Sequence, residues 1–96
     1  MFYRIGKIKC KPGNSDDVIS YFKSKEDFFA DTKGIISLSY FKSGQDEVSG
    51  IAVWESKEIL EKNAERVQVV MGGLMEFVSA PPDIVEGDLE YQFKSV

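Results

Sequence analysis

Any chemistry that this chain performs must proceed without histidine, because none occurs among its 96 residues. Catalytic triads that use histidine, His-ligated zinc and His-ligated haem are therefore excluded. A general base would have to be a carboxylate, a lysine, a tyrosine or the thiol of Cys10, and each needs a shifted pKa to act near neutral pH. We expect Cys10 to be inert, because apolar surroundings raise the pKa of a thiol. We predict no metal site.

The side chains best suited to bind a substrate lie on predicted strands. They are Arg4, Ser37, Ser39, Trp54 and Gln92. A guanidinium stays charged when it is partly desolvated, so Arg4 is the expected partner of an anionic oxygen on a substrate. Trp54 offers a flat wall for an aromatic ring and a single N–H donor. A tryptophan at the end of a strand is more often a packing anchor, and the sequence identifies no catalytic residue.

Two further sets of polar side chains have both a functional and a structural interpretation. Lysine occupies every second position from residue 7 to residue 11. With Arg4 they could steer an anionic substrate, but lysines also keep an exposed strand from aggregating, which we favour. Asn63 and Arg66 border the apolar stripe of the second predicted helix and could line a pocket, but we expect both on the surface.

A strand and a helix that meet at Ser56 organise the elements around these groups. Residues 50–54 are predicted to form a buried strand. Alternation places Ala52 and Trp54 on one face of this strand, and Ile51 and Val53 on the other. Ser56 is a good N-cap, because its hydroxyl can accept a hydrogen bond from a free backbone N–H, and Glu58 suits the positive end of the helix dipole.

The preceding part of the chain supplies two strands and one helix. The first strand spans residues 2–10, with a bulge at Gly6 that would bring its apolar residues to one face. Pro12 and Gly13 end this strand, and Asn14 caps the first helix. The second strand starts at Ile35, and a polar turn at residues 43–47 leads into the strand described above.

The second helix follows Ser56 and is predicted to end at the two prolines at positions 81 and 82. The pair Gly72-Gly73 interrupts it, at roughly 1 kcal/mol per glycine in a helix interior. Either the helix kinks there, or another group packs closely against its backbone. Alternation of Leu89, Tyr91 and Phe93 with polar residues predicts the last strand.

The order βαββαβ predicts an α+β, ferredoxin-like fold, in which a four-stranded antiparallel sheet carries both helices on one face. We expect a single domain over residues 1–96. The residues expected to face the helices are Tyr3, Ile5, Ile8, Cys10, Ile36, Leu38, Tyr40, Ile51, Val53, Leu89, Tyr91 and Phe93. Those expected on the opposite face are Arg4, Ser37, Ser39, Phe41, Ala52, Trp54, Glu90 and Gln92. Because aromatic side chains on this second face would be exposed in a monomer, we expect a partner sheet to cover it and to enclose a cavity.

The bulk composition disfavours several kinds of partner. The net charge of −4 makes nucleic acid a poor candidate. No apolar run approaches the roughly 18 residues that a membrane span needs. The first residues lack the pattern of a secretory signal, and a single cysteine fits a reducing compartment, so we expect a cytoplasmic location.

Several short motifs resemble those of antibiotic biosynthesis monooxygenase domains. They are Lys11-Pro12-Gly13, Gly34, Val53-Trp54-Glu55-Ser56-Lys57-Glu58, Pro81-Pro82 and Gly87-Asp88-Leu89. The resemblance covers nearly the whole chain, and its most specific part is the junction of strand and helix at Ser56. It implies a dimeric α+β barrel, in which two ferredoxin-like sheets face one another. It also implies oxygenation of quinol- or anthrone-like phenols without a cofactor.

The wider superfamily also includes haem-degrading enzymes, which the resemblance allows us to exclude. That branch uses an asparagine on the first strand, a tryptophan in the second helix and a histidine further along that helix. The corresponding positions here are Lys7, Lys62 and Gly72. Haem degradation by that mechanism is therefore not expected.

Two hypotheses from different classes remain. In the first, the chain is a small cofactor-independent monooxygenase that binds a phenol in the barrel cavity and lets its anion react with oxygen. In the second, it is a non-catalytic dimer of the same fold that binds a small aromatic ligand or another protein. A pocket with convergent polar groups favours the first hypothesis, and a space filled by side chains favours the second.

Overall fold

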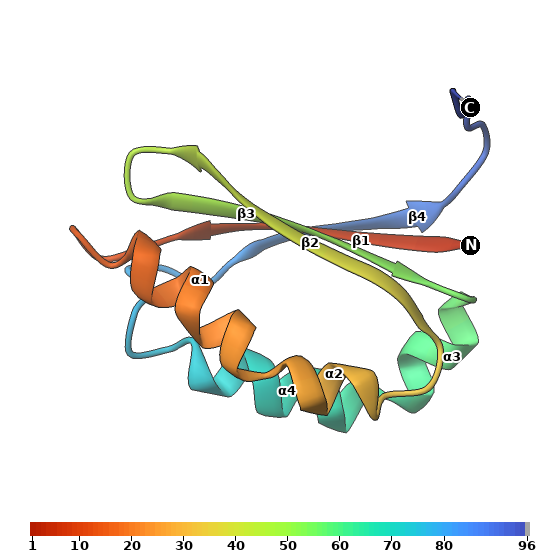
Figure 1. Cartoon of the computed structure of the whole chain (residues 1–96), viewed down its shortest axis with the longest axis horizontal. Helices are drawn as coiled ribbons and strands as arrows, with labels where there is room; N and C mark the ends of the chain where they lie inside the picture. Colours follow the sequence, from red (N-terminus) through yellow and green to blue (C-terminus); the bar gives the residue numbers. More distant parts are fainter. Residues whose placement is uncertain (96) are drawn as a thin grey trace.

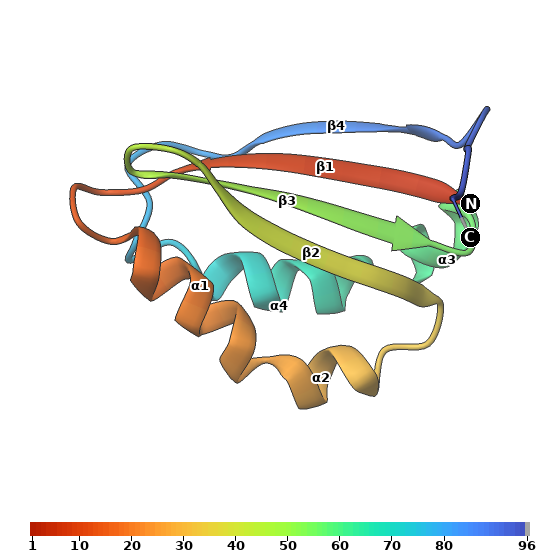
Figure 2. The ribbon, with the colours of Figure 1, turned by 45° about the horizontal axis from the view of Figure 1, so that its top comes forward.

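The computed structural model describes residues 1–95 and shows one antiparallel sheet with the helices on one of its faces (Figure 1, Figure 2). The strands are β1 (Phe2–Lys9), β2 (Ile35–Gly44), β3 (Glu47–Trp54) and β4 (Asp83–Asp88). The helices are α1 (Ser15–Ser24), α2 (Glu26–Ala30), α3 (Lys57–Lys62) and α4 (Ala64–Gly73). The sheet order is β2-β3-β1-β4, so the predicted α+β, ferredoxin-like fold class is confirmed.

Each of the two predicted helices is divided into two shorter ones. The divisions fall at Lys25 and at Asn63, whose backbone angles leave the helical region. The predicted cap at Ser56 is confirmed, because its Oγ accepts a hydrogen bond from the backbone N–H of Ile59 at 3.2 Å. Asn14 does occupy the N-cap position of α1, as predicted, but within residues 1–95 its side chain makes no capping hydrogen bond.

The second helical segment ends at Gly73 rather than at the prolines, because the backbone there is held by a neighbouring side chain. A Cβ added at Gly73 would collide with the hydroxyl of Tyr21 from α1. That hydroxyl donates a hydrogen bond of 2.6 Å to the carbonyl of Val70. Of the two explanations predicted for the glycine pair, close packing against the backbone is observed at Gly73, whereas Gly72 has open space beside it.

The predicted bulge at Gly6 is wrong, and most of the face assignments on β1 and β3 change with it. β1 pairs with β3 in unbroken register from Phe2 to Lys9, so alternation is strict. Arg4 is opposite Ala52, and Phe2 is opposite Trp54. Trp54 packs with Phe2 and with Leu60 of α3, so these residues lie on the helix face. The residues placed on the wrong face by the sequence are Tyr3, Arg4, Ile5, Ile51, Ala52, Val53 and Trp54.

The bulge that does occur lies in β2. The register with β3 shifts between Ile35 and Ser37, so that Ile36 is exposed rather than turned toward the helices as predicted. Leu38 and Tyr40 then face the helices, as predicted, opposite Ala52 and Gly50. The side that carries no helices, formed by Tyr3, Ile5, Ser37, Ser39, Phe41, Ile51, Val53 and Val85, is called the open face below.

The main core lies between the sheet and the helices. It consists of Ile8, Cys10, Val18, Phe22, Val48, Val70, Leu74 and Val78. The ring of Tyr40 stacks on that of Phe22 with 3.7 Å between the ring centroids. A Cβ at Gly50 would collide with the Tyr40 ring, so glycine at this position lets Tyr40 lie flat across β3.

The last strand is not where alternation predicted it. β4 ends at Asp88, and residues 89–95 form no strand. The reason is the length of its neighbour, because β1 begins at Phe2, which is already paired with Asp88. Beyond that point Leu89 makes one hydrogen bond to the carbonyl of Met1, and the rest of the segment leaves the sheet (Figure 1). Leu89, Glu90, Tyr91, Gln92 and Phe93 therefore lie on neither face of the sheet, contrary to the prediction.

Within residues 1–95, every helix is too short or too polar to span a membrane.

Candidate functional site

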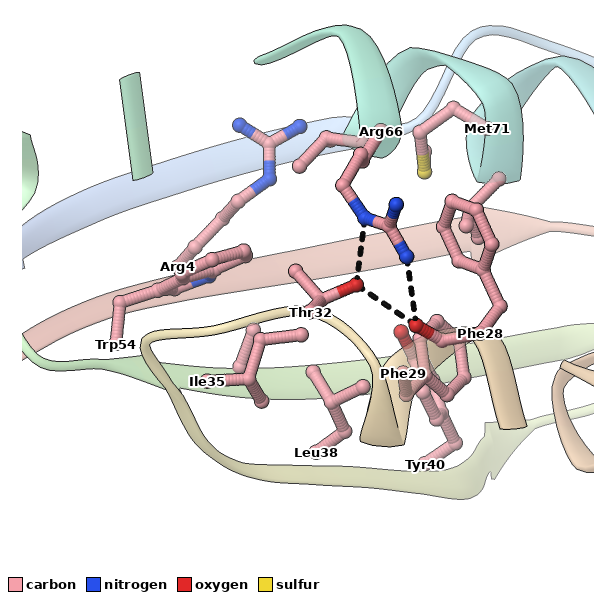
Figure 3. Close-up of a pocket in the computed structure, with 13 residues that line it drawn as sticks. Arg4, Phe28, Phe29, Thr32, Ile35, Leu38, Tyr40, Trp54, Arg66 and Met71 are labelled. Atoms are coloured by element: carbon pink, nitrogen blue, oxygen red, sulfur yellow. Dashed lines mark hydrogen bonds between the residues drawn. The ribbon is translucent and has the colours of Figure 1, made fainter. Parts of the chain in front are cut away.

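A cavity of about 70 Å³ lies between the sheet and the helices (Figure 3). Its walls come from the helix face of the sheet and from the helices that cover it. The lining residues are Arg4, Phe28, Phe29, Thr32, Ile35, Leu38, Tyr40, Ala52, Trp54, Arg66, Val67, Val70 and Met71. The cavity expected from the sequence lay instead between two facing sheets. That expectation followed from placing Arg4 and Trp54 on the opposite face.

The structure brings together two of the five predicted site residues and separates the other three. Arg4 and Trp54 both line the cavity. Ser37 and Ser39 are exposed on the open face, on the other side of the sheet. Gln92 is exposed in the segment beyond β4. The reason for this division is the strict register of β1 and the early end of β4.

Trp54 carries the feature of the cavity that most clearly indicates a ligand. Its side chain is 3% exposed, and its Nε1–H has no hydrogen-bond partner among residues 1–95. A buried donor left without a partner costs roughly 1–3 kcal/mol. The indole forms part of the cavity wall, so an oxygen of a bound molecule could satisfy this donor. The indole also packs against Phe2 and Leu60, so the two roles considered for Trp54 coexist.

Arg66, which we had expected on the surface, lines the cavity. Its Nε donates to Thr32 Oγ1 at 2.8 Å, and its Nη2 donates to the carbonyl of Phe28 at 3.0 Å (Figure 3). Its guanidinium lies 4.0 Å from the centroid of the Phe28 ring, and the exposed carboxylate of Asp31 is 3.7 Å away. These contacts tie α4 to the end of α2 over the cavity.

A signal for Arg66 was present in the sequence. Residues four positions apart share one face of a helix, and Val70, four residues after Arg66, is buried. An arginine at the edge of an apolar stripe can lay its stem on the core and direct its head inward. Asn63, the other residue expected on the surface, donates from Nδ2 to the carbonyls of Ile59 and Lys33, at 2.8 and 3.3 Å. It therefore fixes the chain between α3 and α4.

Arg4, the second arginine that lines the cavity, forms an ion pair with Glu86 of β4. Its Nη1 lies 2.8 Å from Oε2 of Glu86, in an ion pair between neighbouring strands. Two cationic groups thus border a mainly apolar space. Among the described residues that line the cavity none is a carboxylate, so a ligand carrying a negative oxygen would meet no repulsion from the wall.

The tyrosine in the cavity wall is not a base at neutral pH. Burial raises the pKa of Tyr40 to about 12, although the nearby Arg4 charge acts in the opposite direction. Tyr40 therefore stays a neutral phenol that can donate a hydrogen bond. Cys10 lies in the core cluster rather than in the cavity wall, and burial, with the charges of Asp46 and Glu47, raises the pKa of its thiol. A raised pKa keeps the thiol protonated, which agrees with the expectation that Cys10 is inert.

Among residues 1–95, no group of three or more cysteine, aspartate or glutamate side chains is placed to hold a metal ion.

Comparison with known proteins identifies the fold but not a close relative. No protein-family model matches the chain, and no curated protein matches its sequence. Among solved structures, one similar protein is a monooxygenase from the ActVA-Orf6 gene of Streptomyces coelicolor in complex with nanaomycin D. The TM-score is 0.84 at 16% identity, and the match covers 99% of this chain and 92% of that one.

Two further solved structures show the same fold. A candidate antibiotic biosynthesis monooxygenase from Chloroflexus aurantiacus has a TM-score of 0.77 at 18% identity, over 97% of this chain and 96% of the other. The protein NE2512 of unknown function from Nitrosomonas europaea has a TM-score of 0.81 at 13% identity, and the match covers 99% of this chain and 94% of that one. The chain therefore has the fold of antibiotic biosynthesis monooxygenase proteins, as its motifs implied.

Proposed function

We propose that this chain binds a small aromatic compound in the cavity between its sheet and its helices, and that it oxidises a quinol- or anthrone-like phenol with dioxygen and without a cofactor. The observation that carries the proposal is Trp54, whose side chain lines the cavity and whose buried Nε1–H has no partner among residues 1–95. The fold adds support, since a protein of the same fold named as a monooxygenase was solved with nanaomycin D.

The reaction requires little of the protein beyond positioning and electrostatics. An anthrone gives up a proton from its methylene carbon to water and becomes an anion with its charge on oxygen. Dioxygen adds to the carbon, the peroxide anion takes a proton back from water, and the hydroperoxide then loses water to leave a second carbonyl. One oxygen atom thus enters the quinone, and the other leaves as water with two of the substrate's hydrogens. Donors fixed around the anionic oxygen favour the first step.

Three groups of the chain are suited to these tasks. The Nε1–H of Trp54 can donate to the substrate oxygen, and the Arg4 guanidinium can stabilise its negative charge. The apolar walls exclude water, which strengthens both interactions. Tyr40 can donate a second hydrogen bond, because the raised pKa of its hydroxyl keeps it protonated.

A second candidate, ligand binding without turnover, is favoured by the same wall. Among the described residues, no carboxylate lines the cavity and could take the substrate proton. A compound that is already stable to oxygen would bind through the same donors and leave unchanged. The two candidates share the cavity and differ only in whether oxygen is consumed.

The experiment that separates them is oxygen uptake with a panel of quinols and anthrones, with and without added haem or flavin. We expect uptake without either cofactor. Trp54→Phe should keep the aromatic wall, remove the N–H and weaken substrate binding about tenfold, which corresponds to the loss of one buried hydrogen bond. Tyr91→Phe is the matched control, because it removes one polar group from an exposed aromatic ring outside the cavity. Binding without uptake for every compound would establish the second candidate.

We also propose that two copies of the chain pair through the open face. The sequence had assigned this interface to Phe41, Ala52 and Trp54, but only Phe41 lies on the open face. Ile5, Phe41 and Val85 are exposed there, and large exposed apolar side chains on one sheet face favour association. Phe41→Glu should yield a monomer in light scattering, whereas Val69→Glu, which changes an exposed residue of α4, should not. A wild-type monomer at micromolar concentration would refute the pairing.

A further inference from the structure

Arg4 occupies a special position in the space between the sheet and the helices. Beside the cavity of about 70 Å³ lie two further hollows of about 240 and 50 Å³. Among the residues that the structure describes, Arg4 is the one that lines all three. Figure 3 shows its side chain leaving β1 beside the Trp54 ring, with the guanidinium extending away from the ring. A different position of this one side chain would therefore connect the three hollows.

The size of the cavity makes such a connection necessary for binding. An apolar cavity of roughly 150 Å³ is known to accept benzene, and sites for drug-sized ligands usually measure about 300–1,000 Å³. The cavity beside Trp54 holds about 70 Å³. The hollow of about 240 Å³ lies on the far side of Arg4, between β4 and the helices α3 and α4. Movement of Arg4 would add part of this space to the cavity beside Trp54.

The contact that holds Arg4 in place is weak enough to be exchanged. Arg4 and Glu86 form an ion pair of 2.8 Å whose side chains are 25% and 36% exposed. Ion pairs that water reaches contribute little to stability. Glu86 lies opposite Arg4 on β4, an edge strand of the sheet. An anionic ligand in the hollow would compete with the Glu86 carboxylate for the same guanidinium.

We propose that Arg4 is a specificity-determining residue, which separates the three hollows while it is paired with Glu86. An aromatic ligand with an anionic oxygen takes the place of Glu86 and thereby opens the way to Trp54. This inference rests on the proposed function, because it concerns the same cavity. The hollow between β4 and the helices is then the mouth of the site, with Lys57 and Glu61 at its border. Neutral ligands of the same shape do not displace Glu86 and bind less well.

Two probes of equal shape test this proposal. They are 2-naphthoate, which is anionic, and 2-naphthamide, which is neutral. Affinities are measured by calorimetry. Access to the inner cavity is followed by the NMR signal of the indole N–H, which is unambiguous because Trp54 is the single tryptophan. In the wild type, naphthoate should bind more tightly than naphthamide and should shift the indole signal.

Three variants distinguish exchange at Arg4 from a general effect of charge. Arg4→Met should lower naphthoate affinity about tenfold, as expected for the loss of one charge-assisted hydrogen bond, and should not lower naphthamide affinity, because no ion pair then closes the way to Trp54. Glu86→Gln should raise naphthoate affinity severalfold, because the competing carboxylate is gone. Lys62→Met removes the same charge from the exposed surface of α3, outside the three hollows, and should change the affinity for neither probe by more than about twofold.

Each result bears on a stated claim. Tighter naphthoate binding in Glu86→Gln, with unchanged binding in Lys62→Met, supports the exchange, even if Arg4→Met does not fold. Weaker or equal naphthoate binding in Glu86→Gln overturns it, while binding of the probes by the wild type leaves the proposed function standing. If neither probe binds or shifts the indole signal in the wild type, both proposals are wrong.

Discussion

Replacement of Arg66 by alanine tests whether this side chain holds the cavity wall together. Arg66→Ala removes the hydrogen bonds of 2.8 and 3.0 Å to Thr32 and Phe28, and the contact of the guanidinium with the Phe28 ring. A hydrogen bond to a charged group contributes roughly 1.5–3 kcal/mol, and a partly exposed cation–π contact adds roughly 0.5–1 kcal/mol. These values must be reduced for this site.

Two features of the site lower the expected loss. The Arg66 side chain is 34% exposed, so water can replace part of what is removed. The Thr32 hydroxyl also keeps its own hydrogen bond of 2.8 Å to the Phe28 carbonyl, so neither group is left without a partner. We therefore expect a decrease of about 2 kcal/mol in the free energy of unfolding, or roughly 8–16 °C in Tm for a domain of this size.

The measurement is urea unfolding followed by circular dichroism, with Asp31→Asn as the matched control. Asp31 is 3.7 Å from the same guanidinium, but its side chain is 85% exposed. Its replacement should change the free energy of unfolding by less than about 0.5 kcal/mol. Equal losses in the two variants, or a loss below about 0.5 kcal/mol for Arg66→Ala, would show that Arg66 does not hold α2 to α4.

Three further predictions concern local features of the fold. Gly72→Ala should stabilise the chain by about 0.5–1 kcal/mol, because the added Cβ meets open space. Gly73→Ala should destabilise the chain by about 1–3 kcal/mol, because the added Cβ meets Tyr21. Thermal unfolding measures both changes. Ser56→Ala should cost about 1 kcal/mol through loss of the α3 cap, and no change in urea unfolding would contradict the cap. Because burial raises the pKa of Tyr40 from 10.0 to about 12, the unfolded chain loses this proton first, and stability should fall as pH rises through that range. Tyr40→Phe should make the fall shallower, and an equally steep fall in the variant would refute the assignment.

The local elements followed from short-range signals. The order of strands and helices, the N-cap at Ser56 and the turn between β2 and β3 each depend on a few adjacent residues. These features require only backbone propensity and alternation, so the sequence alone was enough for the ferredoxin-like fold. The inert character of Cys10 followed in the same way from its apolar neighbours.

The candidate site was only half predictable. Arg4 and Trp54 were chosen for their chemistry and do line the cavity, whereas Ser37 and Ser39 were assigned to it and lie on the open face. Arg66 was assigned to the surface, because a lone charged residue beside an apolar stripe usually points to water. Its inward position depends on the Phe28 carbonyl, which belongs to a different helix.

The sequence by itself therefore determined the kind and order of the secondary-structure elements. It also determined which side chains are available for chemistry, and that histidine is not among them. What only the tertiary structure decided was the side of the sheet on which each group lies. A strand side chain changes faces with a shift of one residue, so a single assumed bulge at Gly6 displaced Arg4 and Ala52 together. Pairing of β1 with β3 and β4 excluded that bulge, since each backbone hydrogen bond along β1 requires the strict alternation that turns Arg4 and Trp54 toward the helices.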